Sequence, residues 1–223
     1  AQVSVQYAFG VPERVDTIVI SCQHDADKDP TELREELRRL VIARACHDVR
    51  IDENTKIFIN PSGRFVLGGF EADTGLTGRK LMVDTYGGLV PHGGGALSGK
   101  DGTKVDRSGA YMARYVAKNI VAAGLADVCT VSLAYAIGQA EPVAVEIDTQ
   151  ESGYYDDAFL TEAVRRVFDF TPAGMIRALD LDKPFFAEVC NNCHFMHPQA
   201  AWEQTDKTEK LRMVCAELED ERT

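Results

Sequence analysis

The residues best suited to chemistry lie in a glycine-rich segment that runs from Gly68 to Asp106. Basic side chains are interleaved with its glycines, although the whole chain carries a net charge of -11. These basic residues are Arg79, Lys80, Lys100, Lys104 and Arg107. Glycine lets backbone amides approach phosphate oxygens, and lysine and arginine supply the opposite charge. The pattern predicts a cradle for a phosphorylated anion, with a flexible surface loop as the alternative.

The segment comes close to the P-loop pattern without completing it. Gly94 is followed by four residues and then by Gly99 and Lys100. Asp101, however, stands where a P-loop has the Ser or Thr that binds magnesium, so we predict an anion cradle of another kind. Carboxylates in or beside the segment are of the type that holds Mg²⁺ with phosphate oxygens, and also of the type that caps turns. They are Asp73, Asp84, Asp101 and Asp106.

A second cluster contains Cys190, Cys193, His194 and His197. Cys-x-x-Cys-His is the attachment signature of c-type haem, and two cysteines with two histidines also suit zinc. Haem attachment requires export, for which the sequence carries no signal, and the pairs lie closer together than the separated halves of usual zinc sites. We therefore expect reduced cysteines beside a packing histidine.

Secondary-structure patterns before the segment predict an order of two strands, a helix and further strands. The strands are expected at 2–9 and 15–23, with a turn from Gly10 to Glu13, and at 56–61 and 64–69. Asp29 followed by Pro30 predicts a helix start. The expected buried face of that helix holds Leu33, Leu37, Leu40, Val41 and Ala45.

The patterns after the segment predict a second unit of helices and strands. Asp106 is expected to cap a helix that ends at Gly124. Strands are expected at 128–138 and 142–150, and helices at 156–170 and 172–181. The acidic tail is expected to be an exposed helix.

Composition excludes some classes of function. The 223 residues include 35 acidic and 24 basic side chains, which argues against a general nucleic-acid or anionic-membrane binder. No apolar run approaches the roughly 20 residues that span a bilayer, and the first residues do not resemble a signal peptide. These features predict a cytoplasmic protein.

Several sequence blocks resemble the S-adenosylmethionine synthetase (methionine adenosyltransferase) family. DTGLTGRK, VDTYGG, HGGGALSGKD and KVDRS occur in order between residues 63 and 126, and YAIGQAEPVAV and WEQTDK follow. The resemblance implies an α+β fold whose domains each have a curved mixed or antiparallel sheet covered by helices on one face. It implies the C-terminal half of the middle domain at 1–67, and the C-terminal domain with its glycine-rich loop at 68–223.

The resemblance also implies roles for individual residues. Lys100, Arg79 and Lys80 resemble the triphosphate ligands and are the expected catalytic residues. The ATP site would in addition include Arg64, Phe65, which resembles the residue that stacks on adenine, Asp73 and Ala96. Asp73, Lys104 and Ile137 resemble the methionine site, and Asp106 resembles a ligand of Mg²⁺. The family also uses K⁺.

The implied reaction joins ATP and L-methionine to give S-adenosylmethionine, phosphate and diphosphate. The family's GHPDK and GAGDQG motifs have no counterpart in the chain, so we expect a partner chain that carries them, and subunits packed sheet to sheet. A catalytically incomplete regulatory or nucleotide-binding subunit, or a fragment of a longer synthetase, is the alternative. CNNCHFMHP keeps only His194-Phe195 of the family's usual GHF segment.

Overall fold

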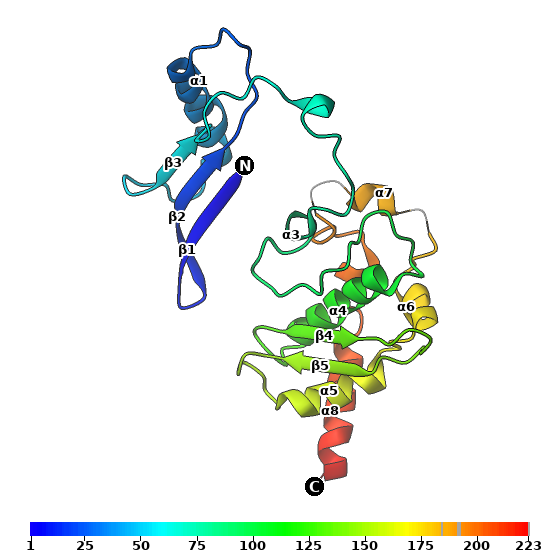
Figure 1. Ribbon diagram of the computed structural model, residues 1–223. Coiled ribbons are helices and arrows are strands. Elements are labelled where there is room, and N and C mark those ends of the chain that lie inside the picture. Colours follow the sequence, from blue (N-terminus) through cyan, green and yellow to red (C-terminus); the bar gives the residue numbers. More distant parts are fainter. Residues whose placement is uncertain (184, 191–192, 223) are drawn as a thin grey trace. The chain divides into compact units, whose positions relative to one another are not determined.

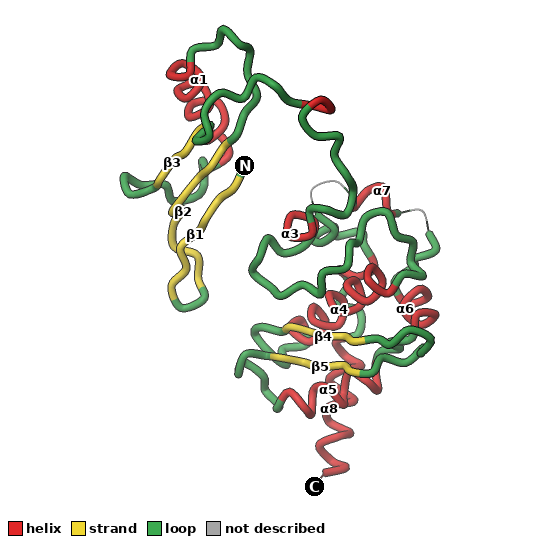
Figure 2. The backbone as a smooth tube through the Cα atoms, viewed as in Figure 1, coloured by secondary structure: helices red, strands yellow, loops and turns green. Residues whose placement is uncertain are grey.

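The computed structural model describes residues 1–183, 185–190 and 193–222, and they form an α+β fold. The chain divides into two compact units, Ala1–Gly75 and Leu76–Thr223. Figure 1 labels the elements, and Figure 2 shows helices and small sheets in both units. The predicted α+β class is confirmed, and the division into domains at residues 67 and 68 stays a prediction.

The first unit contains a mixed three-stranded sheet in the order β1-β2-β3. Strands β1 (Gln2–Ala8) and β2 (Val11–Ile20) form the predicted antiparallel hairpin, and β3 (Lys56–Ile59) pairs with β2 in parallel. The turn lies earlier than predicted, because Val11 and Pro12 already pair with β1. Phe9 and Gly10 make the turn, both with positive φ.

Helix α1 (Pro30–Leu37) begins where the sequence predicts it. Asp29 accepts hydrogen bonds from the backbone amides of Thr31 and Glu32, both at 2.9 Å, and so caps two amides that lack helical partners. A π-helical turn at Arg38–Ile42 and the short α2 (Ala43–Ala45) continue it. The wider turn changes which residues face the sheet. Ile42 is buried, whereas Leu40 and Val41 are exposed, contrary to prediction.

The predicted strand at 64–69 is wrong. His24 N donates to Phe65 O at 2.9 Å, Phe65 N donates to His24 Nε2 at 3.1 Å, and Gln23 Nε2 donates to Val66 O at 2.9 Å. The side chains of Gln23 and His24 thus take hydrogen bonds of the backbone at Phe65 and Val66 that a neighbouring strand would otherwise form, and no ladder of backbone hydrogen bonds is present.

The second unit is built around helix α4 (Val105–Ala122), whose buried face includes Met112, Val116 and Ile120. The helix ends at Ala122 with Ala123 as its C-cap, and Gly124, with φ +71°, terminates it close to the predicted position. Asp106 is not its cap: Lys104 occupies the N-cap position without a side-chain hydrogen bond, and Asp106 lies in the first turn.

Strands β4 (Thr130–Ala134) and β5 (Ala144–Asp148) form the predicted antiparallel pair. Val145 and Ile147 are buried in the core of the unit, whereas Ser132 and Glu146 on the other face are exposed. Helices α4 and α5 (Asp157–Val167) pack against these strands, and α8 (Thr208–Arg222) packs against α5 (Figure 1). The helices therefore cover one face of a small sheet.

Shorter helices complete the second unit. They are α3 (Leu81–Asp84), α6 (Pro172–Ala178), α7 (Phe186–Val189) and a 3₁₀ turn at Ala201–Glu203. The acidic tail is helical, as predicted, but α8 is not simply exposed, because Leu211, Cys215 and Leu218 are buried in the core. A further 3₁₀ turn, Gly69–Glu71, lies in the first unit. In the part of the chain that the structure describes, no helix is long and apolar enough to cross a membrane.

The cap of α1 gives a first prediction. Asp29→Ala removes the acceptor for two backbone amides, so we expect the first unit to lose about 1 kcal/mol of unfolding free energy. Asp27→Ala removes an exposed carboxylate outside the cap and is the matched control. Urea denaturation of both variants measures the difference, and equal stability of the two would contradict the capping role.

Candidate functional site

Two loops of the glycine-rich segment pack against each other within the second unit. Gly78 has φ +72°, and a methyl group in place of its hydrogen would approach Ala96 Cβ to 2.8 Å. Gly99 has φ +85°, and its substituent would lie 3.3 Å from Thr77 Cγ2. Larger residues at either position would strain the backbone, and at Gly78 they would also push the loops apart. The loops that carry Arg79, Lys80, Ala96 and Lys100 are therefore neighbours.

Asp106 brings the start of α4 to the same place. Its carboxylate pairs with Lys100 Nζ at 2.6 Å, and a methyl group on Gly95 would overlap it, at 2.5 Å from Oδ1. The Lys100 side chain is 28% exposed and that of Asp106 is 55% exposed. A partly exposed pair of this kind contributes little to stability. Lys100 could therefore leave Asp106 to bind a phosphate, and Asp106 could leave Lys100 to bind a cation.

The other basic residues of the segment differ in their partners. Arg79 and Lys80 are exposed, and neither has an ion pair with any residue that the structure describes. Lys104 pairs with Asp101 at 3.2 Å. Hydrogen bonds from the side chain and backbone of Thr103, and then from Lys104, lower the pKa of Asp101 to about 2. Asp101 is thus a turn residue, and the anion cradle stays a prediction.

Four of the predicted site residues belong to other segments of the chain. Arg64, Phe65 and Asp73 belong to the first unit. Arg64 Nη2 donates to Ala26 O at 2.5 Å, and Asp73 Oδ1 accepts from Gly75 N at 2.9 Å. Ile137 is fully exposed on the loop between β4 and β5. The second unit groups Arg79, Lys80, Ala96, Lys100, Lys104 and Asp106, and the roles of all these residues stay predictions.

Sequence reasoning missed a buried hydrogen-bond chain behind the cluster. His194 Nε2 lies 2.8 Å from Ser98 Oγ, and Nδ1 lies 2.7 Å from the Tyr111 hydroxyl. Arg107 Nε donates to the same hydroxyl at 2.9 Å, and Arg107 Nη1 donates to Lys100 O at 2.6 Å. These hydrogen bonds therefore connect both Ser98 and Lys100 to the core. The only signal in the sequence was the presence of His194 and Arg107 in recognisable motifs.

The Cys/His cluster does not form a zinc site in the described residues. Asn191 and Asn192, between the two cysteines, lie outside those residues. Both ring nitrogens of His194 are engaged by Ser98 and Tyr111, and no group of three or more His, Cys, Asp or Glu side chains in the described ranges could hold a metal ion. The cysteines of the described chain form no disulfide, and their reduced state stays a prediction.

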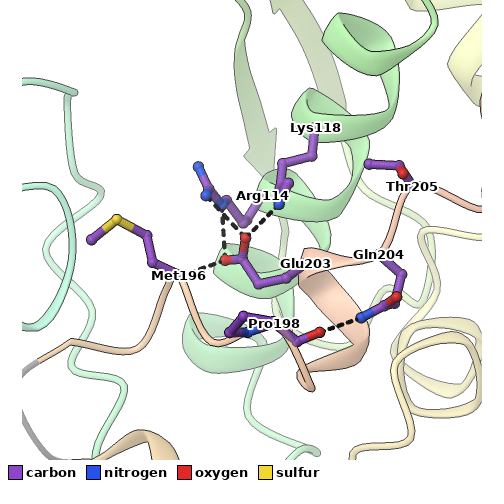
Figure 3. Close-up of a pocket in the computed structure, with 7 residues that line it drawn as sticks. All are labelled: Arg114, Lys118, Met196, Pro198, Glu203, Gln204 and Thr205. Carbon is purple, nitrogen blue, oxygen red and sulfur yellow. Dashed lines mark hydrogen bonds and ion pairs between the residues drawn. The ribbon is translucent and has the colours of Figure 1, made fainter.

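A hollow of about 320 Å³ lies elsewhere in the second unit (Figure 3). Its lining includes Glu203, which receives hydrogen bonds from Arg114 at 3.0 Å, Lys118 at 2.8 Å and Met196 N at 2.9 Å. Burial alone would raise the pKa of Glu203, but Arg114 and Lys118 lower it overall. These charges satisfy one another, so we interpret the network as structural.

Comparison with known proteins decides the family. The model described as S-adenosylmethionine synthetase, C-terminal domain, matches residues 67–204, and the model of the central domain matches residues 1–65. The chain belongs to the S-adenosylmethionine synthetase family. A solved structure of an unusual S-adenosylmethionine synthetase from Campylobacter jejuni is 37% identical, with a TM-score of 0.82. The match covers 95% of this chain and 58% of that one, so the chain spans little more than half of its relative.

Magnesium, which these synthetases generally use, fits the cluster in one way. Mg²⁺ beside phosphates commonly takes one or two carboxylates and completes its shell with phosphate oxygens and water. Asp106, partly exposed and in contact with Gly95 and Lys100, supplies one such carboxylate. One carboxylate would suit an ion that takes its other ligands from phosphate oxygens and water, and the described residues offer no group of three or more such side chains that could hold it alone.

His194 gives a prediction about pH. Burial, helped by the charge of Arg107 and opposed by Asp84, lowers the pKa of His194 from 6.5 to about 4. Between these two pH values the unfolded chain binds more protons at His194 than the folded chain does. The stability that neutral His194 contributes is therefore fully present above pH 6.5 and is lost as the pH falls towards 4. The loss approaches about 3 kcal/mol.

Denaturation at several pH values in this window measures the effect. His194→Gln should be less stable than the unaltered chain at neutral pH and should lose less stability on acidification. His47→Gln, which changes an exposed histidine, should behave like the unaltered chain. Equal pH dependence in all three proteins would show that His194 is not held neutral.

Proposed function

We propose that this chain is a subunit, or part, of an S-adenosylmethionine synthetase. It would form S-adenosylmethionine, phosphate and diphosphate from ATP, L-methionine and water, together with a partner chain that carries the GHPDK and GAGDQG motifs. The observation that carries the proposal is that the loop leading into the exposed cations Arg79 and Lys80 packs against the loop leading into Lys100, whose side chain pairs with Asp106. Such a cluster suits a highly charged triphosphate.

In this proposal the methionine sulfur attacks C5′ of ATP, and the whole triphosphate leaves before it is hydrolysed. The protein's task is to place the sulfur in line and to stabilise the leaving group's charge. Arg79, Lys80 and Lys100 bind phosphate oxygens, and Asp106, which pairs with Lys100 in this structure, would hold a magnesium ion. Magnesium, when bound, supplies further positive charge at the triphosphate. We assign no residue of this chain to K⁺.

Substrate contacts are proposed for the remaining residues. Phe65 stacks on adenine beside Arg64, and Ala96 lies along the nucleotide. Asp73, Lys104 and Ile137 form the methionine side of the site. The full exposure of Ile137 is consistent with a residue that ligand or a second chain would cover. We also propose a cytoplasmic protein in which subunits pack sheet to sheet.

Lys100→Ala is the sharpest test of the catalytic role. We expect synthesis by the complex with the partner chain to fall at least about 100-fold, because a charge that stabilises the leaving group is lost. Stability should change by less than about 0.5 kcal/mol, since the lysine is partly exposed. Lys210→Ala, which removes an exposed lysine of α8, is the charge-matched control and should leave synthesis unchanged. Turnover and urea denaturation provide the two readouts.

The alternatives predict different results in the same experiment. Unchanged turnover of the Lys100→Ala complex would contradict the assignment. Calorimetric binding of ATP without any S-adenosylmethionine in the complex would instead indicate a nucleotide-binding subunit.

A further inference from the structure

Arg107 is a buried positive charge without a carboxylate. The residue is 3% exposed, and it forms no ion pair with any residue that the structure describes. Nε and Nη1 donate to the Tyr111 hydroxyl and to Lys100 O, and the guanidinium carbon lies 3.4 Å from the ring centre of Phe186. Nη2 is buried without a hydrogen-bond partner. A buried cation compensated only by neutral groups favours an anion nearby.

The charge of Arg107 determines which group donates in each hydrogen bond from Tyr111 through His194 to Ser98. The Tyr111 oxygen accepts from Arg107, and burial raises the pKa of Tyr111 to about 12, so the phenol keeps its own proton. The acceptor within reach of that proton is His194 Nδ1, at 2.7 Å. Neutral His194 therefore carries its proton on Nε2 and donates it to Ser98 Oγ.

Ser98 ends this chain at the glycine loops. Its oxygen is already an acceptor for His194, so its own hydroxyl proton is left to donate. The residue is partly exposed and follows Leu97, which is fully buried and anchors the loop. Ser98 O lies 3.7 Å from the position that a methyl group on Gly78 would take, so Ser98 adjoins the residue before Arg79. Hydrogen bonds in series polarise one another, which strengthens the last donor.

We propose that Ser98 binds a phosphoryl oxygen of the substrate, and that Tyr111 and His194 are positioning residues that leave the Ser98 proton free for it. This inference rests on the proposed function, because it adds a donor to the same anion cradle. It adds no step to the chemistry. It explains why a histidine and a tyrosine are buried behind a loop that faces solvent.

The proton placement can be measured by NMR of the full chain labelled with ¹⁵N-histidine. The His194 signals are assigned by their loss in His194→Gln. We expect a neutral ring at pH near 7, protonated on Nε2, and a shift towards mixed tautomers in Tyr111→Phe, which keeps the stacking on Trp202 but removes the hydroxyl. A ring protonated on Nδ1, or on both nitrogens, would overturn the inference.

Binding of magnesium tripolyphosphate, followed by calorimetry on the full chain, tests Ser98 itself. Ser98→Ala should weaken binding about tenfold, because a hydrogen bond to a charged oxygen is lost. Ser98→Thr keeps the hydroxyl and should bind within about threefold of the unaltered chain, and Ser152→Ala, on a distant turn, is the control.

The Lys100→Ala variant separates this inference from the proposed function. Loss of binding in Lys100→Ala with none in Ser98→Ala would overturn the role of Ser98 alone. Unaltered binding in both variants, or no binding by the unaltered chain, would count against the anion cradle and hence against both proposals.

Discussion

The conformation of the glycine-rich segment depends on the hydrogen bonds through which the buried charge of Arg107 is satisfied. A segment with few ladder hydrogen bonds needs other partners for its backbone, and Arg107 supplies one to Lys100 O. Tyr111 and His194 extend the same network to Ser98. The charge of Arg107 is thus satisfied by a carbonyl, a phenol and an aromatic ring rather than by a carboxylate. Arg107 therefore supports the backbone of the segment and also the anion site that we propose.

Local signals in the sequence were sufficient for most of the fold. Asp29 and Pro30 fixed the start of α1, and Gly124 fixed the end of α4, because caps act on adjacent backbone groups. The errors arose where tertiary contacts override such signals. The π-helical turn moved Leu40 out of the core, and Asp106 forms an ion pair with Lys100 where a cap was expected.

The sequence likewise identified one part of the candidate site and missed another. The basic residues and glycines were identifiable because they are neighbours in sequence, and the second unit does place Lys100 and Asp106 in contact. The hydrogen-bond chain behind them could not be identified from the sequence, because His194 lies 96 positions from Ser98 and 83 from Tyr111. These side chains meet only in the folded second unit, where Ser98 of the glycine-rich segment and Tyr111 of α4 both contact His194. The sequence suggested metal or packing roles for His194, whereas the structure gives both ring nitrogens hydrogen-bond partners.

The family and the fold are established, and the central claim beyond them is that this chain supplies the triphosphate-binding part of a synthetase completed by a second chain. Native mass spectrometry of the complex, purified gently from its source, tests that claim most directly. The account predicts a hetero-oligomer whose second chain carries GHPDK and GAGDQG. This chain alone, as a monomer or a homodimer, would contradict the split synthetase.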